Sequence, residues 1–321
     1  MTDPDTSTAP RRFPRALMTS AGMGVLYGRF PSLDGAYARR VLWDDAGAVV
    51  VRETLATGRP CMIGRLGSVE LGCASYRTRW RSGAIRLPYP GFLRSAINLN
   101  AGVFPADDAS LDRFSDIFLA AVTKADVFGV CLHRNEEPIV ARYCPTAKLV
   151  HLEAMNAVIR DDPWTTELEG KTVLVVHPFA RTIESQYRTK RTLLFKDPRI
   201  LPEFELKTLT AVQSGAGNDC GFATWPDALE HMRSEIARTE FDIAIIGAGA
   251  YGLPLAASVK DMGRQAVHLG GATQLLFGIR GRRWETEAAD VIAPLFNEYW
   301  VRPSAQETPA GCSSVEGGCY W

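Results

Sequence analysis

The 321-residue chain can bury a large core, and its formal net charge of zero gives it no global attraction to nucleic acid or to an anionic membrane. Any selectivity for a phosphate must therefore be local. Hydrophobic residues make up 46% of the chain, yet no apolar run approaches the roughly 18 residues of a transmembrane helix. We therefore expect a soluble cytoplasmic protein with no transmembrane segment and no nucleic-acid partner.

The N-terminus and the cysteines fit a cytoplasmic location. Residues 1–12 are polar, contain proline and lack the apolar stretch of a signal peptide, which indicates a disordered leader. The seven cysteines are scattered, and none forms a C-x-x-C pair. Cys61, Cys73 and Cys131 lie in or beside apolar runs, which is typical of buried thiols in a reducing compartment. With five histidines and no cysteine pair, the sequence predicts no structural zinc site.

The first half of the chain alternates helical and strand patterns. We expect helices over 36–57, from about Ser68 onward, and over 110–124 with Ser110 as its cap. The strands expected here cover 61–64, 126–132 and 148–152, and a loop rich in Gly, Pro and Asn covers 82–108.

The second half continues the alternation. Thr172–Val176 (TVLVV) is nearly all apolar, as are strands buried on both faces of a parallel sheet. Further strands are expected over 204–212, 243–246 and 266–269, and helices over 180–195, 226–239 and 253–262. This order predicts an α/β fold with a Rossmann-like, mostly parallel sheet flanked by helices. We expect one domain over 13–301, with a candidate sub-division near 165–171, and a C-terminal tail over 302–321.

The stretch 242–271 (DIAIIGAGAYGLPLAASVKDMGRQAVHLGG) is a strand, turn, helix and strand with two glycine corners. Gly247, Gly249 and Gly252 spell G-x-G-x-x-G, and glycine lets a phosphate approach the backbone at a helix start. A dinucleotide site also requires an acid about 20 positions later, where this chain has Gly270 and Gly271. We expect no NAD. A different phosphate contact, a classical NAD site and a purely structural turn all remain open.

Polar residues follow other strands as well, and ligands bind at the carboxyl ends of strands in open parallel sheets. Arg65 and Glu70 follow the strand at 61–64, and His177 and Arg181 follow TVLVV. The segment 213–218 follows a third strand, and Thr273 and Gln274 follow the second glycine corner. We expect these ends to surround one cleft.

Each of these side chains also has a structural interpretation. Glu70 could ligate a divalent metal, act as a base or pair with Arg65, or it could only stabilise a helix start. His177 could be a base or a donor to phosphate, or an ordinary hydrogen-bonded histidine. Arg181 lies one turn into its helix, where it could contact a diphosphate or belong to a solvated, salt-bridged face.

Residues 63–71 (IGRLGSVEL) resemble the early motif of the bacterial GT-D-type glycosyltransferases, roughly R-F-G-D-G-E. Arg65, Gly67 and Glu70 match it, and Ser68 stands at the Asp position. In that family the D-x-E part is thought to hold a metal ion and the nucleotide-sugar diphosphate. The resemblance therefore implies donor contacts at 65–70, and at most a weakened Mn²⁺ or Mg²⁺ site, because Glu70 alone binds a divalent ion less well than an Asp/Glu pair.

Other segments resemble bacterial proteins that we associate with the same fold: VVHPFARTIESQY, ELKTLTAVQS, DIAIIGAGAYGLPLAA, HLGGATQLLFGIRGRRW and VEGGCYW. The resemblance implies transfer of a sugar from a nucleotide sugar to a glycan or small-molecule acceptor, in a largely uncharacterised branch of the family.

Such a reaction would use Glu70 or His177 as the base, and a set of cations, amides and glycines around the diphosphate: Arg65, Gly67, Ser68, Arg181, Gly247, Gly249, Gly252, Gly270, Gly271 and Gln274. Two alternatives remain. One is an NAD(P)-dependent oxidoreductase that uses the Gly247–Gly252 turn, and the other is a non-catalytic protein that binds nucleotides or sugar phosphates. The sequence specifies neither the sugar and acceptor nor the oligomeric state.

Overall fold

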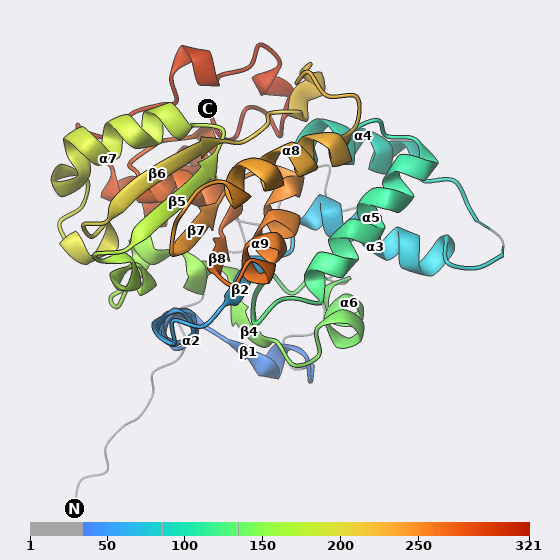
Figure 1. Cartoon of the computed structure of the whole chain (residues 1–321), viewed down its shortest axis with the longest axis horizontal. Coiled ribbons are helices and arrows are strands. Elements are labelled where there is room, and N and C mark those ends of the chain that lie inside the picture. The colour runs from blue at the N-terminus through green and yellow to red at the C-terminus, as the bar shows by residue number, and fades with distance from the viewer. Residues whose placement is uncertain (1–34, 85, 134) are drawn as a thin grey trace, which may run out of the picture.

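The computed structural model describes residues 35–84, 86–133 and 135–321. Within them, eight strands form one sheet in the order β1-β4-β3-β2-β8-β7-β5-β6 (Figure 1). Every neighbouring pair of strands is parallel. The predicted α/β, Rossmann-like fold is therefore confirmed, with a wholly parallel sheet. The leader predicted at 1–12 lies outside the described residues.

The strands are β1 (Val41–Leu42), β2 (Cys61–Arg65), β3 (Val127–Val130), β4 (Lys148–His151), β5 (Thr172–His177), β6 (Glu205–Thr210), β7 (Ile243–Ile246) and β8 (Gln265–His268). The longer helices are α2 (Asp44–Ala56), α3 (Ser68–Trp80), α4 (Gly91–Ala101), α5 (Asp108–Val122), α6 (Glu136–Tyr143), α7 (Ala180–Leu194), α8 (Trp225–Ala237) and α9 (Gly252–Asp261). Three short helices follow: α10 (Thr273–Leu276), α11 (Arg282–Thr286) and α12 (Ala289–Ile292).

The sheet is the middle of three layers. Successive side chains of a strand point to opposite faces, so Ile243 and Ile245 of β7 pack in one core, and Ala244 and Ile246 in the other. The core of Ala244 contains buried residues of α3, α4, α5, α8 and α9, and the core of Ile243 contains those of α2, α7 and residues 275–300. Figure 1 shows α8 and α9 in front of the sheet and α7 at its left end. Helices thus cover both faces of the sheet.

Three helical assignments from the sequence were wrong. The helix expected over 36–57 begins at Asp44, because the short edge strand β1 precedes it. The expected loop over 82–108 contains α4, which buries Leu93, Ile97 and Ala101 at helical spacing. The cap of α5 is Asp107, whose carboxylate accepts a hydrogen bond from the amide of Ser110 at 2.9 Å. The helix α6 was missed.

Residues 302–321 are irregular, as expected of a tail, but they pack against the domain. The side chains of Glu307, Val315 and Cys319 are buried, and Val301, just before the segment, forms a bridge with Ile279. In Figure 1 this red segment runs across the top of the view. Residues 165–171 connect β4 to β5 within the same sheet. Among the described residues, no helix is both long and apolar enough to cross a membrane.

Candidate active site

Four neighbouring strands, β2, β8, β7 and β5, bring predicted site residues to one edge of the sheet. From β2 the chain runs through β3 and β4 toward one end of the sheet, β5 leads to β6 at the other end, and β7 leads back to β8 beside β2. The neighbouring strands β5 and β7 therefore lead away in opposite directions, and ligands bind at such a reversal of the strand order. Arg65 and His177 end β2 and β5, whereas Gly247 and Gly270 follow β7 and β8. Because these strands are parallel neighbours, their carboxyl ends lie at the same edge of the sheet, and the cleft expected between them stays a prediction.

Arg65 lies over the second glycine corner. Gly270 has a φ of +62°, and a Cβ atom built there would lie 3.1 Å from Nη1 of Arg65. Within the described part of the chain, no hydrogen bond or ion pair engages the guanidinium of this half-buried arginine. The charge of Arg65 nevertheless acts on its neighbours: burial first and Arg65 second lower the pKa of His133 and His268, and Arg65 opposes the rise that burial causes in the pKa of Glu70. Arg65 is therefore a cation available to a ligand.

Glu70 lies in the first turn of α3, close to Arg65. Its carboxylate covers Gly67, where a Cβ atom would come within 2.2 Å of Oε2. Burial raises the pKa of Glu70, and this effect is opposed by a hydrogen bond from its own amide and by the charge of Arg65. The nearby charge of Glu316 raises the pKa further. Ser68 is the first residue of α3 and is half-buried.

His177 holds the turn between β5 and α7. Its Nδ1 accepts a hydrogen bond from the amide of Phe179 at 3.0 Å, and its ring packs on Gly247. Burial lowers the pKa of His177 to about 3. The imidazole is therefore neutral and weakly basic at neutral pH, which fits a hydrogen-bonded structural histidine.

Side chains of the protein fill the space beside two of the three fingerprint glycines. A Cβ atom at Gly247 would lie 2.6 Å from the ring of His177, and one at Gly252 would lie 2.1 Å from the ring of His268. Gly249 is more open, since a Cβ atom there would meet only the carbonyl oxygen of Ala101, at 3.5 Å. The corner at 247–252 therefore packs tightly against the rings of His177 and His268, as a structural turn would.

The N-terminus of α7 is capped by the C-terminal segment. Glu307 accepts hydrogen bonds from the amides of Arg181 and Thr182 at 2.9 and 3.3 Å, and from the hydroxyl groups of Thr182 and Ser304. The exposed guanidinium of Arg181 donates to Gln306 at 2.7 Å. A carboxylate of the chain itself thus lies where the sequence suggested a diphosphate near Arg181.

The same segment covers the second glycine corner. A Cβ atom at Gly271 would come within 2.3 Å of the ring of Tyr320. The side chain of Gln274 is fully buried and donates to the carbonyl oxygens of Ile279 and Tyr320 at 3.2 and 3.3 Å. Gln274 therefore anchors the C-terminal segment, and Arg65 at Gly270 remains the polar group available beside it.

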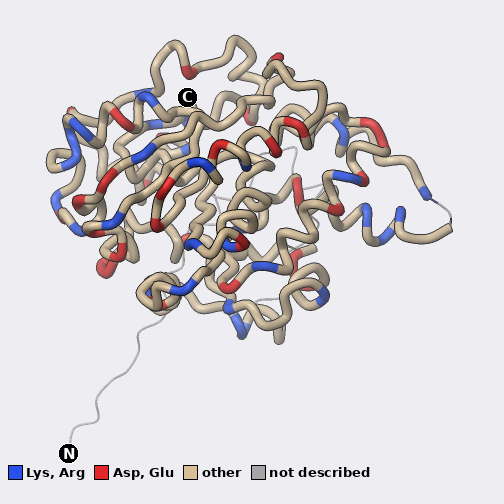
Figure 2. Tube along the Cα trace, in the orientation of Figure 1, with Lys and Arg blue, Asp and Glu red and all other residues tan. Residues whose placement is uncertain are grey.

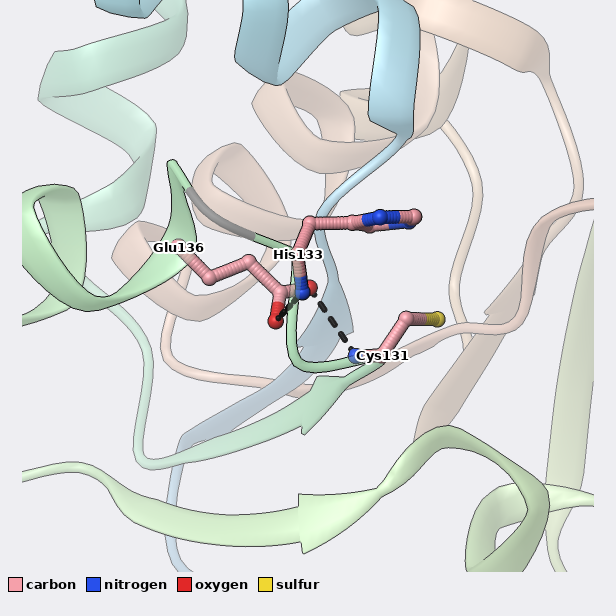
Figure 3. A group of neighbouring side chains, drawn as sticks. All are labelled: Cys131, His133 and Glu136. Atoms are coloured by element: carbon pink, nitrogen blue, oxygen red, sulfur yellow. Dashed lines mark hydrogen bonds between the residues drawn. The ribbon is translucent and has the colours of Figure 1, made fainter. Parts of the chain in front are cut away.

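The sequence reasoning missed a cluster that follows β3, the strand next to β2. Cys131, His133 and Glu136 place a sulfur, an imidazole nitrogen and a carboxylate oxygen within 4.8 Å of one another (Figure 3). β3 pairs with β2 so that Gly129 lies opposite Arg65, and the cluster therefore adjoins the same edge of the sheet. The spacing Cys-x-His-x-x-Glu after a predicted strand was the signal that could have revealed it.

Charges outside this edge are mixed. Figure 2 shows Lys and Arg interspersed with Asp and Glu over the outer helices. Many of them pair locally, as Arg188 does with Glu184 at 2.6 Å. Selectivity for an anionic ligand would therefore come from local groups at the edge of the sheet, and not from a surface of one charge.

Comparison with known proteins gives two structures with a similar fold. No protein-family model and no curated protein matches the chain. One structure, described as a selenomethionine-substituted domain of unknown function 1792, is 12% identical over 84% of this chain and 93% of its own, with a TM-score of 0.42. The other is described as "The highly conserved domain of unknown function 1792 has a distinct glycosyltransferase fold"; it is 13% identical over 81% and 96%, with a TM-score of 0.35.

With TM-scores of 0.42 and 0.35, neither likeness carries an argument about the activity of this chain. The activity must be argued from the residues of the site.

Proposed function

We propose that the chain binds a nucleotide sugar at the carboxyl ends of β2 and β8 and transfers its sugar to a glycan or small-molecule acceptor. The observation that carries this proposal is the guanidinium of Arg65 over Gly270, which no other described side chain engages. A nucleoside diphosphate leaving group requires cations and N–H groups for its developing charge. The first turn of α3 begins three residues after Arg65 and supplies such N–H groups.

Glu70 would act as the base in this reaction. Its carboxylate lies near Arg65, and burial raises its pKa, which makes it a stronger base than an exposed carboxylate. Glu70 would take the proton of the acceptor hydroxyl as that oxygen attacks the anomeric carbon. The electron pair of the broken glycosidic bond would leave on the diphosphate, beside Arg65. His177, with its pKa near 3, would hold the turn instead.

The residues around Glu70 do not fit a Mn²⁺ or Mg²⁺ ion well. Ser68 stands at the motif position of the Asp, and a hydroxyl group is a weaker ligand for these ions than a carboxylate. The carboxylate of Glu316, which raises the pKa of Glu70, is engaged in an ion pair with Arg283. No step of the proposed reaction therefore passes through a metal at Glu70.

A second candidate function is non-catalytic binding of a nucleotide or sugar phosphate. It is favoured by the hydrogen bond from the amide of Glu70 to its own carboxylate, which is the arrangement of an acid that stabilises a helix start. An NAD(P) site receives less support, because the ring of His268 fills the space beside Gly252. We propose no NAD site.

Replacement of Glu70 separates the two candidates. If Glu70 is the base, Glu70→Gln should abolish release of nucleoside diphosphate from the donor while the thermal unfolding temperature stays near that of the wild type. The matched control is Glu184→Gln, a partly exposed helical acid paired with Arg188, which should keep wild-type turnover. A helix-stabilising Glu70 would instead cost a few tenths to about 1 kcal/mol in unfolding free energy. Wild-type turnover in Glu70→Gln would show that this acid is not the base.

A further inference from the structure

The turn after β3 carries three side chains with the chemistry of transition-metal ligands. Cys131, His133 and Glu136 offer one sulfur, one nitrogen and one oxygen atom, all within 4.8 Å of one another. Ligands of a tetrahedral Zn²⁺ ion, bound at about 2.0–2.3 Å, lie roughly 3.5 Å apart. Small side-chain rotations would therefore bring the three atoms onto one ion.

The turn already orients the carboxylate. Glu136 accepts hydrogen bonds from the amides of Cys131 and His133, both at 2.9 Å, and its side chain is fully buried. Hydrogen bonds of this kind fix a ligating group and leave it further lone pairs. Figure 3 shows the sulfur of Cys131 and the ring of His133 projecting to the same side of the turn, with the carboxylate held against its backbone. Cys131 and His133 are partly exposed, which gives an ion a path from solvent.

The kinds of ligand atom in the cluster indicate which metal ion it would prefer. Sulfur and imidazole favour Zn²⁺ and its neighbours over Mg²⁺, Mn²⁺ and Ca²⁺, which prefer oxygen. Three protein ligands leave one position open, as in zinc sites that bind a water or a substrate. The neighbouring charge of Arg65 opposes a cation, but a thiolate and a carboxylate together carry two negative charges that offset an ion of charge +2. We propose that Cys131, His133 and Glu136 form a Zn²⁺-binding site beside Arg65. The proposal stands whether or not the chain transfers a sugar.

Cobalt substitution tests the site, because a thiolate bound to Co²⁺ gives a charge-transfer band in the near ultraviolet. The full-length chain would be stripped with a chelator, loaded with Zn²⁺ or Co²⁺, and freed of loosely bound ions by gel filtration. We expect one retained metal ion per chain by elemental analysis, and the charge-transfer band in the Co²⁺ form. Cys131→Ser should lose the band and weaken Zn²⁺ binding by roughly tenfold or more. Cys144→Ser, which removes a buried thiol at the end of α6, should change neither.

His133→Gln is the second variant, because this side chain is only partly buried and the substitution is compatible with folding. It should weaken Zn²⁺ binding by a similar factor while the thiolate band survives at saturating Co²⁺. Metal-free unfolding temperatures close to the wild type would show that both variants fold. A wild-type chain that retains no metal, or a Cys131→Ser variant that retains metal and band unchanged, would overturn the proposal. Unchanged Zn²⁺ affinity in His133→Gln would overturn it as well.

Discussion

Gly252 has no room for a side chain, and this requirement is set by another residue of the protein. A Cβ atom there would lie 2.1 Å from the ring of His268, which is buried and bonded through Nδ1 to the carbonyl oxygen of Ile246 at 3.2 Å. Because the ring cannot easily move, overpacking at this position should be costly.

Gly252→Ala should therefore lower the free energy of unfolding by about 1–3 kcal/mol, measured by urea denaturation. Gly91→Ala is the matched control, since Gly91 is also the first residue of its helix, and nothing lies within 4 Å of a Cβ atom there. The control should be neutral or slightly stabilising because alanine favours helices. Equal stability of the two variants would contradict the packing described for His268.

Two buried histidines should make the fold sensitive to acid. Burial lowers the pKa of His177 and His268 from 6.5 to about 3. Between these values the unfolded chain binds protons that the folded chain does not, so the unfolding free energy falls as the pH drops below 6.5. Each histidine should contribute about 1.4 kcal/mol per pH unit within this window.

The test is the pH dependence of stability between 6.5 and about 5, above the range where most carboxylates titrate. Glu136, whose pKa is raised to about 7 by burial, acts in the opposite sense, so the slope must be compared with a variant. His177→Asn with His268→Asn keeps hydrogen-bonding groups near both positions and should flatten the slope. An unchanged slope would mean that neither ring is held neutral.

Side-chain roles at the site were only partly predictable from the sequence. Arg65 and Glu70 could be singled out because they follow an apolar strand and belong to a short local motif. The surroundings of Arg181 could not be predicted in this way. The group that caps the start of its helix is the carboxylate of Glu307, which lies 126 positions further along the chain. The cover of Gly271 by Tyr320 is likewise a contact between distant segments. Local patterns indicate which residues reach the edge, whereas long-range contacts decide which of them remain open to a ligand.

The start of α7 and the C-terminal segment depend on one another through Glu307. This buried carboxylate satisfies two amides of the first turn and the hydroxyl groups of Thr182 and Ser304. Removing it leaves buried donors without an acceptor, so Glu307→Ala should cost about 1–3 kcal/mol of unfolding free energy.

The same variant should expose residues 302–321 to proteases, which limited proteolysis would detect. Gln306→Ala is the matched control, because Gln306 is exposed and binds only the side chain of Arg181. Its effect should stay within about 0.5 kcal/mol. If Glu307→Ala is as stable and as protease-resistant as Gln306→Ala, the carboxylate does not hold the segment in place.

Strands were predicted better than helices. The runs at β5 and β7 are continuous and apolar because both faces of the sheet are covered, and such runs are clear in a sequence. The helix α4 was hidden by the glycines and prolines around it, although Leu93 and Ile97 carry its buried face. β1 has only two residues and is stabilised by pairing with β4. A pairing with so distant a strand leaves no local pattern in the sequence from which β1 could be predicted.

In the part of the chain that the structure describes, Arg65 lies at the carboxyl edge of a wholly parallel sheet with its guanidinium open to a ligand. Helices cover both faces of this sheet, and the C-terminal segment covers the neighbouring glycine corner. The net charge of zero provides no long-range attraction, so binding of an anionic donor must depend on this local cation. A ligand that binds the folded protein raises its unfolding temperature. This shift measures donor binding directly, and it can be measured without knowing the acceptor.

The decisive measurement is a thermal-shift and calorimetric comparison of nucleotide sugars, NAD(H) and NADP(H) on the wild type, Arg65→Ala and Arg181→Ala. We expect a nucleotide sugar to stabilise the wild type and NAD(H) to give no shift. Charged hydrogen bonds are worth roughly 1.5–3 kcal/mol, so Arg65→Ala should bind the donor about tenfold or more weakly. Arg181→Ala, whose side chain binds Gln306, should bind it as the wild type does. Equal donor affinity in Arg65→Ala and the wild type, or micromolar binding of NAD(H), would contradict a donor site at Arg65.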